Sequence, residues 1–231
     1  DKVLIIPFTE QFSLTTAQVF AETVLKDLFN PEVISVGTNH YFGHKKEGDL
    51  AFLKVFCQEN DIKLHVPEMI EHEGSTISSS LIRSLILDGN SSKVYDYLGR
   101  FYGFNAKIVS GSNRGKKMNY PTANFIPTFK NQLLPSTGVY LSRVFLDGEN
   151  YFGMTNAGVR PTFNEKKFVM EVHILSDKFG NLYDKNFYIE FLDKIRDEKK
   201  FDSKKLLIKQ IEKDKEVCIE LIDTFKEKYE I

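Results

Sequence analysis

A stretch dense in Gly, Asn and Lys near the middle of the chain has the composition of an anion-binding loop. It reads GSNRGKKMNYPTANF and spans residues 111–125. Glycines let successive backbone N–H groups turn toward one bound anion. The Arg and Lys side chains add charge-assisted hydrogen-bond donors. The residue types therefore predict a phosphate cradle over residues 111–118.

The spacing of this stretch differs from that of a P-loop. A P-loop has four residues between its glycines and a Ser or Thr after its Lys. Here three residues separate Gly111 from Gly115, and Lys117 follows Lys116. An exposed basic hairpin would have the same composition, so the spacing alone leaves both interpretations open.

Two neutral oxygen ligands follow the glycines, in the sequence Pro121-Thr122-Ala123-Asn124. Thr122 and Asn124 are two residues apart, so an extended chain points both side chains to one face. Hydroxyl and amide oxygens suit Mg²⁺, which takes few protein ligands when substrate phosphates supply the rest. The structural alternative is a Pro-Thr turn in which the Asn side chain caps the backbone.

Glu171 is the candidate general base. In residues 167–175 the apolar side chains of Met170 and Val172 fall on one face of a strand and Glu171 falls on the other. A carboxylate there could accept the proton of a substrate hydroxyl and direct it toward a phosphoryl group. A solvent-facing Glu on a half-exposed strand is the alternative.

Composition and length exclude several classes of protein. The 231 residues are 42% hydrophobic, which is enough for a packed core in one large domain or two small ones. No apolar run approaches the roughly 18 residues of a membrane helix. Cys57 and Cys218 are far apart and lack metal-type neighbours, which argues against a disulfide framework or a zinc site. The opening DKVLIIPFTE has no secretory pattern, so a reducing cytoplasm is the expected location.

The charge is unevenly distributed along the chain. Residues 1–97 carry 8 Lys and Arg against 14 Asp and Glu, and the remainder carries 23 against 18. The mildly basic second part suits an anionic ligand such as a nucleotide phosphate. It lacks the concentrated basic stripe that nucleic-acid binding usually needs.

Short apolar runs alternate with helical patterns in the first part of the chain, which is typical of parallel βαβ units. Thr15 or Thr16 caps the first helical pattern, and Asp88-Gly89-Asn90 separates the last two. The expected strands are residues 3–6, 33–36 and 62–66, and the expected helices begin near residues 16, 50, 78 and 93. This pattern indicates a partial Rossmann-like domain over residues 1–97.

The second part changes to runs rich in aromatic and β-branched residues, separated by Gly, Asn and Asp turns. The expected strands are residues 101–109, 139–146, 151–156, 167–175 and 187–192. Several strands at this spacing suggest a small antiparallel barrel. A charged helix from about 203 to 228 carries an apolar stripe that is expected to cover the barrel. We therefore predict a second domain over residues 98–231.

Five segments of the second part resemble, in order and spacing, the riboflavin kinase domain. They are RGKKMNYPTANF (114–125), LPSTGVY (134–140), GMTNAGVRPTF (153–163), MEVHIL (170–175) and KIRDEKKFDS (194–203). The resemblance implies an α/β plus all-β protein whose six-stranded antiparallel barrel transfers the γ-phosphoryl group of ATP, with Mg²⁺, to the 5′-hydroxyl of riboflavin. The product is FMN.

The resemblance also implies roles by position. Glu171 matches the catalytic base, and Thr122 and Asn124 match the residues that meet Mg²⁺ and nucleotide phosphates. The other implied ATP-binding residues are Gly111, Ser112, Arg114, Gly115, Lys116, Lys117 and Met118. The implied flavin-binding residues are Asn156, Arg160 and Arg196.

The first part resembles the FMN adenylyltransferase domain of bifunctional bacterial FAD synthetases. The segments are SVGTNHYFGHKKEGD (35–49) and ISSSLIR (77–83). The second would bind nucleotide phosphate through Ser78, Ser79, Ser80 and Arg83, since a helix start offers N–H and hydroxyl donors; a plain Ser cap with a surface Arg is the alternative. No HxGH-type loop occurs, so we expect the N-terminal part of that domain to be absent.

Two other functions stay open. The principal activity of the intact protein could be FMN adenylylation. The barrel could instead be a non-catalytic flavin- or nucleic-acid-binding module, because basic residues alternate with Tyr102, Phe104, Tyr120 and Phe125. The resemblance favours riboflavin and ATP as small-molecule partners, without nucleic acid or membrane, and leaves the oligomeric state undetermined.

Overall fold

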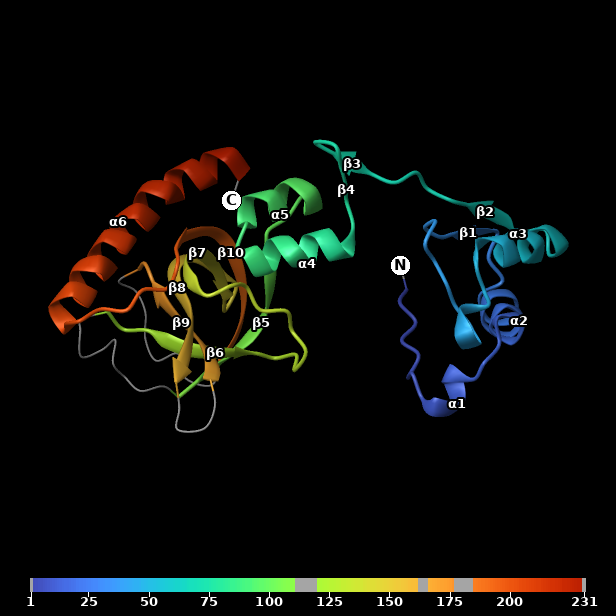
Figure 1. Cartoon of the computed structure of the whole chain (residues 1–231), viewed down its shortest axis with the longest axis horizontal. Coiled ribbons are helices and arrows are strands. Elements are labelled where there is room, and N and C mark those ends of the chain that lie inside the picture. The colour runs from blue at the N-terminus through green and yellow to red at the C-terminus, as the bar shows by residue number, and fades with distance from the viewer. Residues whose placement is uncertain (1, 111–119, 162–165, 177–184, 230–231) are drawn as a thin grey trace. The chain divides into compact units, whose positions relative to one another are not determined.

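The computed structural model describes residues 2–110, 120–161, 166–176 and 185–229. The chain forms two compact units, Asp1–Thr76 and Ile77–Ile231 (Figure 1). Over the residues described, none of the helices combines the length and apolar character needed to cross a bilayer.

The first unit contains the expected βαβ arrangement. Strands β1 (Val33–Ser35) and β2 (Lys63–His65) pair in parallel, and helix α3 (Leu50–Glu59) lies between them in sequence. Asp49 caps α3 by accepting a hydrogen bond from the backbone N–H of Phe52. The other elements are α1 (Glu10–Ser13), α2 (Ala17–Phe20), the π-helix η1 (Ala21–Phe29), η2 (His44–Lys46), β3 (Glu71–His72) and β4 (Ser75–Thr76).

The strand expected at residues 3–6 does not form. Val3 and Ile5 are 88% and 85% exposed. Within the described residues β1 and β2 pair only with each other, and residues 3–6 are not added to either edge of this sheet. An apolar run becomes a buried strand only where a sheet edge accepts it, and the prediction was wrong for that reason.

The second unit begins with two helices, α4 (Ser79–Asp88) and α5 (Ser91–Leu98), which pack through Ile82, Ile86 and Val94. The compact units therefore divide at Thr76–Ile77. The domain division at residues 97 and 98 rests on sequence motifs and stays a prediction.

The strands of the second unit close into an antiparallel barrel in the order β10-β5-β6-β9-β8-β7. Each strand alternates between a side chain inside the barrel and one outside. In β9 the inside positions are Met170, Val172 and Ile174, so Glu171 and His173 point outward as expected. The described strands are β5 (Tyr102–Val109), β6 (Ala123–Pro127), β7 (Gly138–Leu146), β8 (Glu149–Pro161), β9 (Lys166–Ile174) and β10 (Asn186–Arg196).

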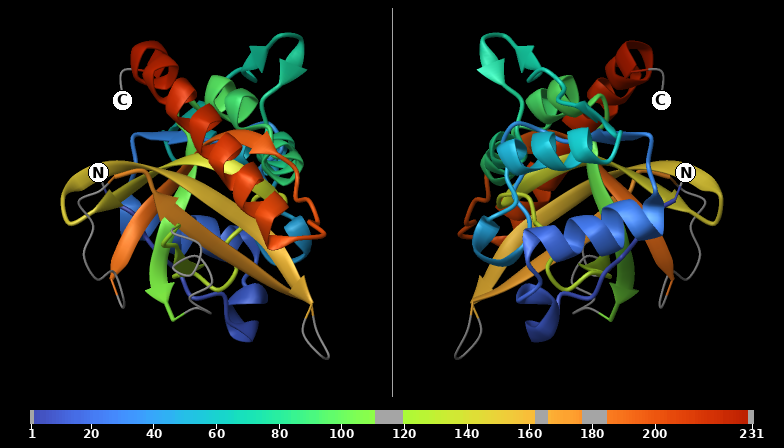
Figure 2. Two further views of the ribbon diagram at one scale, coloured as in Figure 1. Left: turned by 90° about the vertical axis from the view of Figure 1, so that its left-hand side faces the viewer. Right: turned by 90° about the vertical axis from the view of Figure 1, so that its right-hand side faces the viewer.

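The long C-terminal helix α6 (Lys204–Tyr229) lies across the outside of the barrel, against β8 and β10 (Figure 2). Cys218 and Phe225 of α6 form a second core with residues on the outer face of the barrel, among them Val139 and Leu141 of β7. The prediction that this helix covers the barrel is confirmed. Leu206 is the exception in the expected stripe, because its side chain is exposed.

Candidate active site

One register row across the outer face of the barrel carries the residues that the sequence analysis singled out. Asn124 of β6 stands opposite Glu171 of β9, and Glu171 stands opposite Asn156 of β8. Asn156 is in register with Val139 of β7, and Val139 with Arg196 of β10. Directly opposed residues of antiparallel strands point to the same face. Five strands therefore present this row to one side of the sheet.

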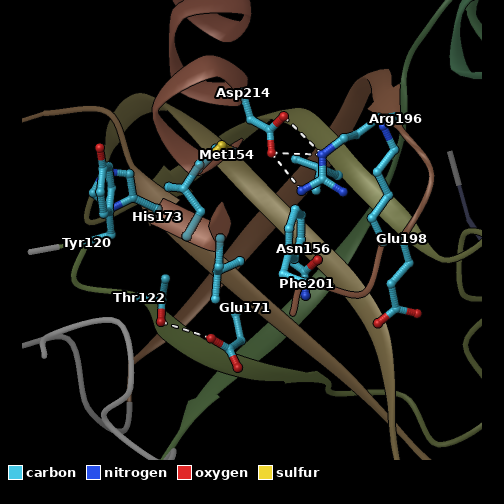
Figure 3. Close-up of a pocket in the computed structure, with 14 residues that line it drawn as sticks. Tyr120, Thr122, Met154, Asn156, Glu171, His173, Arg196, Glu198, Phe201 and Asp214 are labelled. Atoms are coloured by element: carbon cyan, nitrogen blue, oxygen red, sulfur yellow. Dashed lines mark hydrogen bonds and ion pairs between the residues drawn. The ribbon is translucent and has the colours of Figure 1, made fainter. Parts of the chain in front are cut away.

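The row borders a cavity of about 420 Å³ between the barrel, residues 198–201 and the first half of α6 (Figure 3). This size lies in the range of roughly 300–1,000 Å³ that small-molecule sites occupy. Eight of the fourteen described lining residues are polar or charged, and the other six are apolar or aromatic. The lining residues are Tyr120, Thr122, Val139, Met154, Asn156, Glu171, His173, Arg196, Glu198, Lys199, Phe201, Leu207, Ile211 and Asp214.

Thr122 and Glu171 meet at one side of the cavity. The Thr122 hydroxyl donates a hydrogen bond to Glu171 Oε2 at 3.0 Å (Figure 3). Thr122 directly precedes β6 and Glu171 lies within β9, so the pairing of these strands brings together residues that are distant in sequence. The structure thus places a hydroxyl and a carboxylate within reach of one substrate group. Asn124 belongs to the same face but is not among the described residues that line the cavity.

A buried ion pair fixes the opposite side. Arg196 Nε donates to both carboxylate oxygens of Asp214 at 2.9 Å, and one terminal guanidinium nitrogen lies 2.7 Å from Oδ2. Gln210 of α6 donates to Asp214 Oδ1 at 2.7 Å. The Arg196 guanidinium also lies 5.8 Å from the ring centre of Phe201. Asp214 is only 2% exposed, and its carboxylate binds Arg196 through both oxygens. These contacts hold the guanidinium in one orientation.

His173 lies beside Thr122 on the same outer face of the barrel. Its Nδ1 is 2.8 Å from the Pro121 carbonyl oxygen, and its ring packs edge-on against Tyr120 with 5.5 Å between ring centres. Burial lowers the pKa of His173 below its ordinary value, an effect that the Pro121 hydrogen bond partly offsets and the Lys215 charge reinforces. The neutral imidazole is therefore the favoured form at neutral pH.

The other candidate residues differ in where the structure places them. Asn156 lines the cavity, and its flavin-binding role stays a prediction. Ser78 caps α4 by accepting a hydrogen bond from the N–H of Leu81 at 3.2 Å, and Ser79, Ser80 and Arg83 are exposed. Their nucleotide role stays a prediction. The loop residues Gly111, Ser112, Arg114, Gly115, Lys116, Lys117 and Met118 lie outside the described residues, as does the side chain of Arg160.

Asp214 is a site residue that the sequence analysis missed. The apolar stripe of α6 runs through Leu207, Ile211, Cys218 and Leu221, and Asp214 occupies the stripe position between Ile211 and Cys218. A lone acid on the buried face of a helix implies a basic partner across the interface. That signal could have found Asp214. Nothing in the local sequence distinguishes Phe201 or Glu198 as cavity residues.

Comparison with known families agrees with this geometry. A model described as riboflavin kinase matches residues 98–222, which is more than half of the chain, and a model described as FAD synthetase matches residues 1–81. The chain belongs to the riboflavin kinase family. The family prediction drawn from five ordered segments is confirmed, and so is the fold class of a partial Rossmann-like unit followed by a barrel with a C-terminal helix.

Individual relatives support the same assignment. A protein of Pseudomonas fluorescens is 30% identical over 88% of this chain and 65% of its own length. One of Haemophilus influenzae is 32% identical over 94% of this chain and 70% of its own length. Both are named bifunctional riboflavin kinase/FMN adenylyltransferase, and the chain spans about two thirds of their length. Together with the match to the riboflavin kinase model, these relatives confirm the predicted class of enzyme, a riboflavin kinase.

A solved structure shares the fold as well. It is titled as a macrolide-efflux protein from Streptococcus pneumoniae, has 33% sequence identity and superposes with a TM-score of 0.81. The match covers 91% of this chain and 67% of that one.

Replacement of Asp214 by Ala is expected to destabilise the second unit. It would leave the Arg196 side chain, which is only 14% exposed, without its carboxylate partner, a change that costs about 3–5 kcal/mol in buried pairs. Chemical denaturation followed by circular dichroism measures the free energy of unfolding. Asp223→Ala is the matched control, because Asp223 lies on the exposed side of the same helix. Equal small losses in the two variants would contradict the anchoring role of Asp214.

Proposed function

We propose that this chain catalyses the Mg²⁺-dependent transfer of the γ-phosphoryl group of ATP to the 5′-hydroxyl of riboflavin, giving FMN and ADP. The observation that carries the proposal is the hydrogen bond between Thr122 and Glu171 at the edge of the cavity. Membership of the riboflavin kinase family supports the choice of substrates. We expect the reaction to take place in the cytoplasm, where ATP is abundant.

Glu171 is the general base of this proposal. Its carboxylate accepts the proton of the riboflavin 5′-hydroxyl while the alcohol oxygen forms a bond to the γ-phosphorus. The bond from the γ-phosphorus to the bridging oxygen of ATP breaks, and ADP leaves with that electron pair. The Thr122 hydroxyl donates to Glu171 Oε2, so it fixes the plane of the carboxylate that receives the proton.

The residues on this face fit a magnesium ion that arrives with ATP. Within the described part of the chain no three His, Cys, Asp or Glu side chains form a metal cluster. The neutral hard oxygens on this face, beside the Glu171 carboxylate, are the Thr122 hydroxyl and the Asn124 amide. This small donor set suits an ion whose other ligands are phosphates and water. When bound, the ion neutralises charge that develops on the transferred phosphoryl group.

Arg196 and the apolar wall are proposed to hold the flavin. Arg196 is kept in place by Asp214, and Asn156 stands in the same row with β7 between them. Met154 and Phe201 supply apolar surface in the same cavity. A planar aromatic ring system would bury its faces against such surface and direct its polar edge to the fixed donors. Residues 111–118 and Arg160 keep their predicted roles toward ATP phosphates and flavin.

Glu171→Gln is expected to slow FMN formation at least about 100-fold, because the amide cannot accept the proton in the transfer step. Riboflavin binding should change little, since the amide keeps the shape of the side chain. Chromatographic separation of FMN after incubation with riboflavin, ATP and Mg²⁺ measures the rate. Glu149→Gln, at an exposed strand start, is the control. Wild-type turnover in the Glu171 variant would remove this residue from the mechanism.

Thr122→Ala is expected to weaken the binding of Mg²⁺ and nucleotide more than the binding of riboflavin. The substitution removes a hard oxygen ligand and the donor to Glu171, and leaves the flavin wall intact. Calorimetric titration with Mg·ADP and, separately, with riboflavin compares the two affinities. Thr128→Ala serves as control, because the Thr128 hydroxyl bonds the Asn105 carbonyl at the far end of β6. Equal losses for both ligands would indicate general damage to the barrel.

FMN adenylylation is the second candidate activity. The match of the FAD synthetase model to residues 1–81 favours it. It transfers the AMP part of ATP to the phosphate of FMN, which gives FAD and releases pyrophosphate. Incubating the chain with FMN, ATP and Mg²⁺ and separating FAD tests this activity independently of the kinase.

A further inference from the structure

The segment of residues 120–122, which brings the Thr122 hydroxyl to Glu171, lies outside the regular strand pairing between β6 and β9. Pairing between β6 and β9 is registered from Ala123 opposite Val172, and Thr122 precedes β6. Pro121 has no N–H group, so it cannot donate to a neighbouring strand. Its carbonyl oxygen still needs a donor. Something other than the regular ladder must therefore hold this segment against β9.

His173 supplies that donor. Its Nδ1 lies 2.8 Å from the Pro121 carbonyl oxygen. A carbonyl can only accept, so the ring proton must be on Nδ1 and the hydrogen bond runs from His173 to Pro121. His173 comes directly after Val172 in β9, and its side chain thus continues the attachment of the two strands past the last registered pair.

The surroundings of His173 restrict the ring. Its residue is 9% exposed, and Tyr120 packs edge-on against it at an interplanar angle of 70° (Figure 3). The charge that acts on it from α6 is that of Lys215, and burial further disfavours the imidazolium. The ring is therefore neutral and fixed, with Nδ1 aimed at the backbone of the segment that contains Thr122.

We propose that His173 is a positioning residue for phosphoryl transfer: by donating to the Pro121 carbonyl it sets the Thr122 hydroxyl on Glu171 Oε2. This inference rests on the proposed kinase activity for its catalytic consequence. His173 itself need not touch either substrate. The hydrogen bonds His173–Pro121 and Thr122–Glu171 lie on consecutive residues of one segment, so loss of the first displaces the donor of the second.

Two substitutions separate this role from plain packing. An Asn side chain places its amide at the position of Nδ1 and can still donate to Pro121, whereas a Gln side chain places its amide at the position of Nε2. We expect His173→Gln to lower kcat by about 100-fold, the scale of a misplacement near 1 Å. We expect His173→Asn to keep most of the wild-type kcat, and KM for riboflavin to change little in both. Equal losses of kcat in the two variants would overturn the proposal.

A double-variant cycle tests whether His173 acts through Thr122. In a Thr122→Val background the hydroxyl is gone, so His173→Gln should cause little further loss of kcat. If the kcat of the double variant falls by the product of the two single-variant losses, the proposal is overturned. Leu175→Ala is the control for general destabilisation, because Leu175 packs beside α6 two residues beyond His173. The factor by which Leu175→Ala lowers kcat should be the same in the wild-type and in the Thr122→Val background.

A measurement without turnover keeps this inference distinct from the proposed activity. In ¹⁵N-labelled wild-type protein the two ring nitrogens of His173 should report a neutral ring with its proton on Nδ1. Amide hydrogen exchange of Thr122 and Ala123 should accelerate at least about tenfold in His173→Gln and stay near wild type in His173→Asn. If the ¹⁵N signals and the exchange rates match these expectations while the wild type forms no FMN, the proposed function fails but the positioning of Thr122 by His173 is supported. A proton on Nε2 of His173, or unchanged amide exchange in His173→Gln, would overturn the proposed positioning role.

Discussion

The alternation of side chains around a closed antiparallel barrel is the constraint on which the site depends. Because the period of a strand is two, a slip of one residue would exchange the inner and outer faces. Met170 and Val172 would then leave the core, and Glu171 would enter it. Burial of the apolar face therefore fixes where the carboxylate points. The same register places Asn156 and Arg196 on that side as well.

An outer barrel face is ordinarily open to water, and here α6 turns part of it into a cavity. Cys218 and Phe225 provide apolar attachment on one half of the helix. On the other half Ile211 packs against the same cluster, and Asp214 forms an ion pair with Arg196. A buried ion pair adds little net stability compared with apolar packing, but breaking it is costly. Its value here is orientation, since the carboxylate holds the arginine that borders the cavity.

Much of the barrel was predictable because its strands are rich in aromatic and β-branched residues and are separated by Gly, Asn and Asp turns. The pattern did not predict β6, which has five residues and ends in Pro127. The apolar run at residues 3–6 misled because hydrophobicity does not supply a neighbouring strand. Thr122 and Glu171 were identifiable by type and spacing. The His173–Pro121 bond was not, because it depends on how two strands end and not on either strand's composition.

Three carboxylates of the described residues line the cavity, and their partners distinguish them. Asp214 accepts from Arg196 on both oxygens and from Gln210 on one, so its lone pairs are committed to protein donors. Glu198 lies beyond the end of β10, on the segment over residues 198–201 that borders the cavity. Glu171 alone of the three receives a hydroxyl that is itself a candidate ligand for the metal with the nucleotide. A metal bound to that oxygen would acidify the hydroxyl and strengthen its donation to Glu171. Under the proposed function, binding of the phosphate donor would then also orient the base, a coupling that suits phosphoryl transfer by positioning.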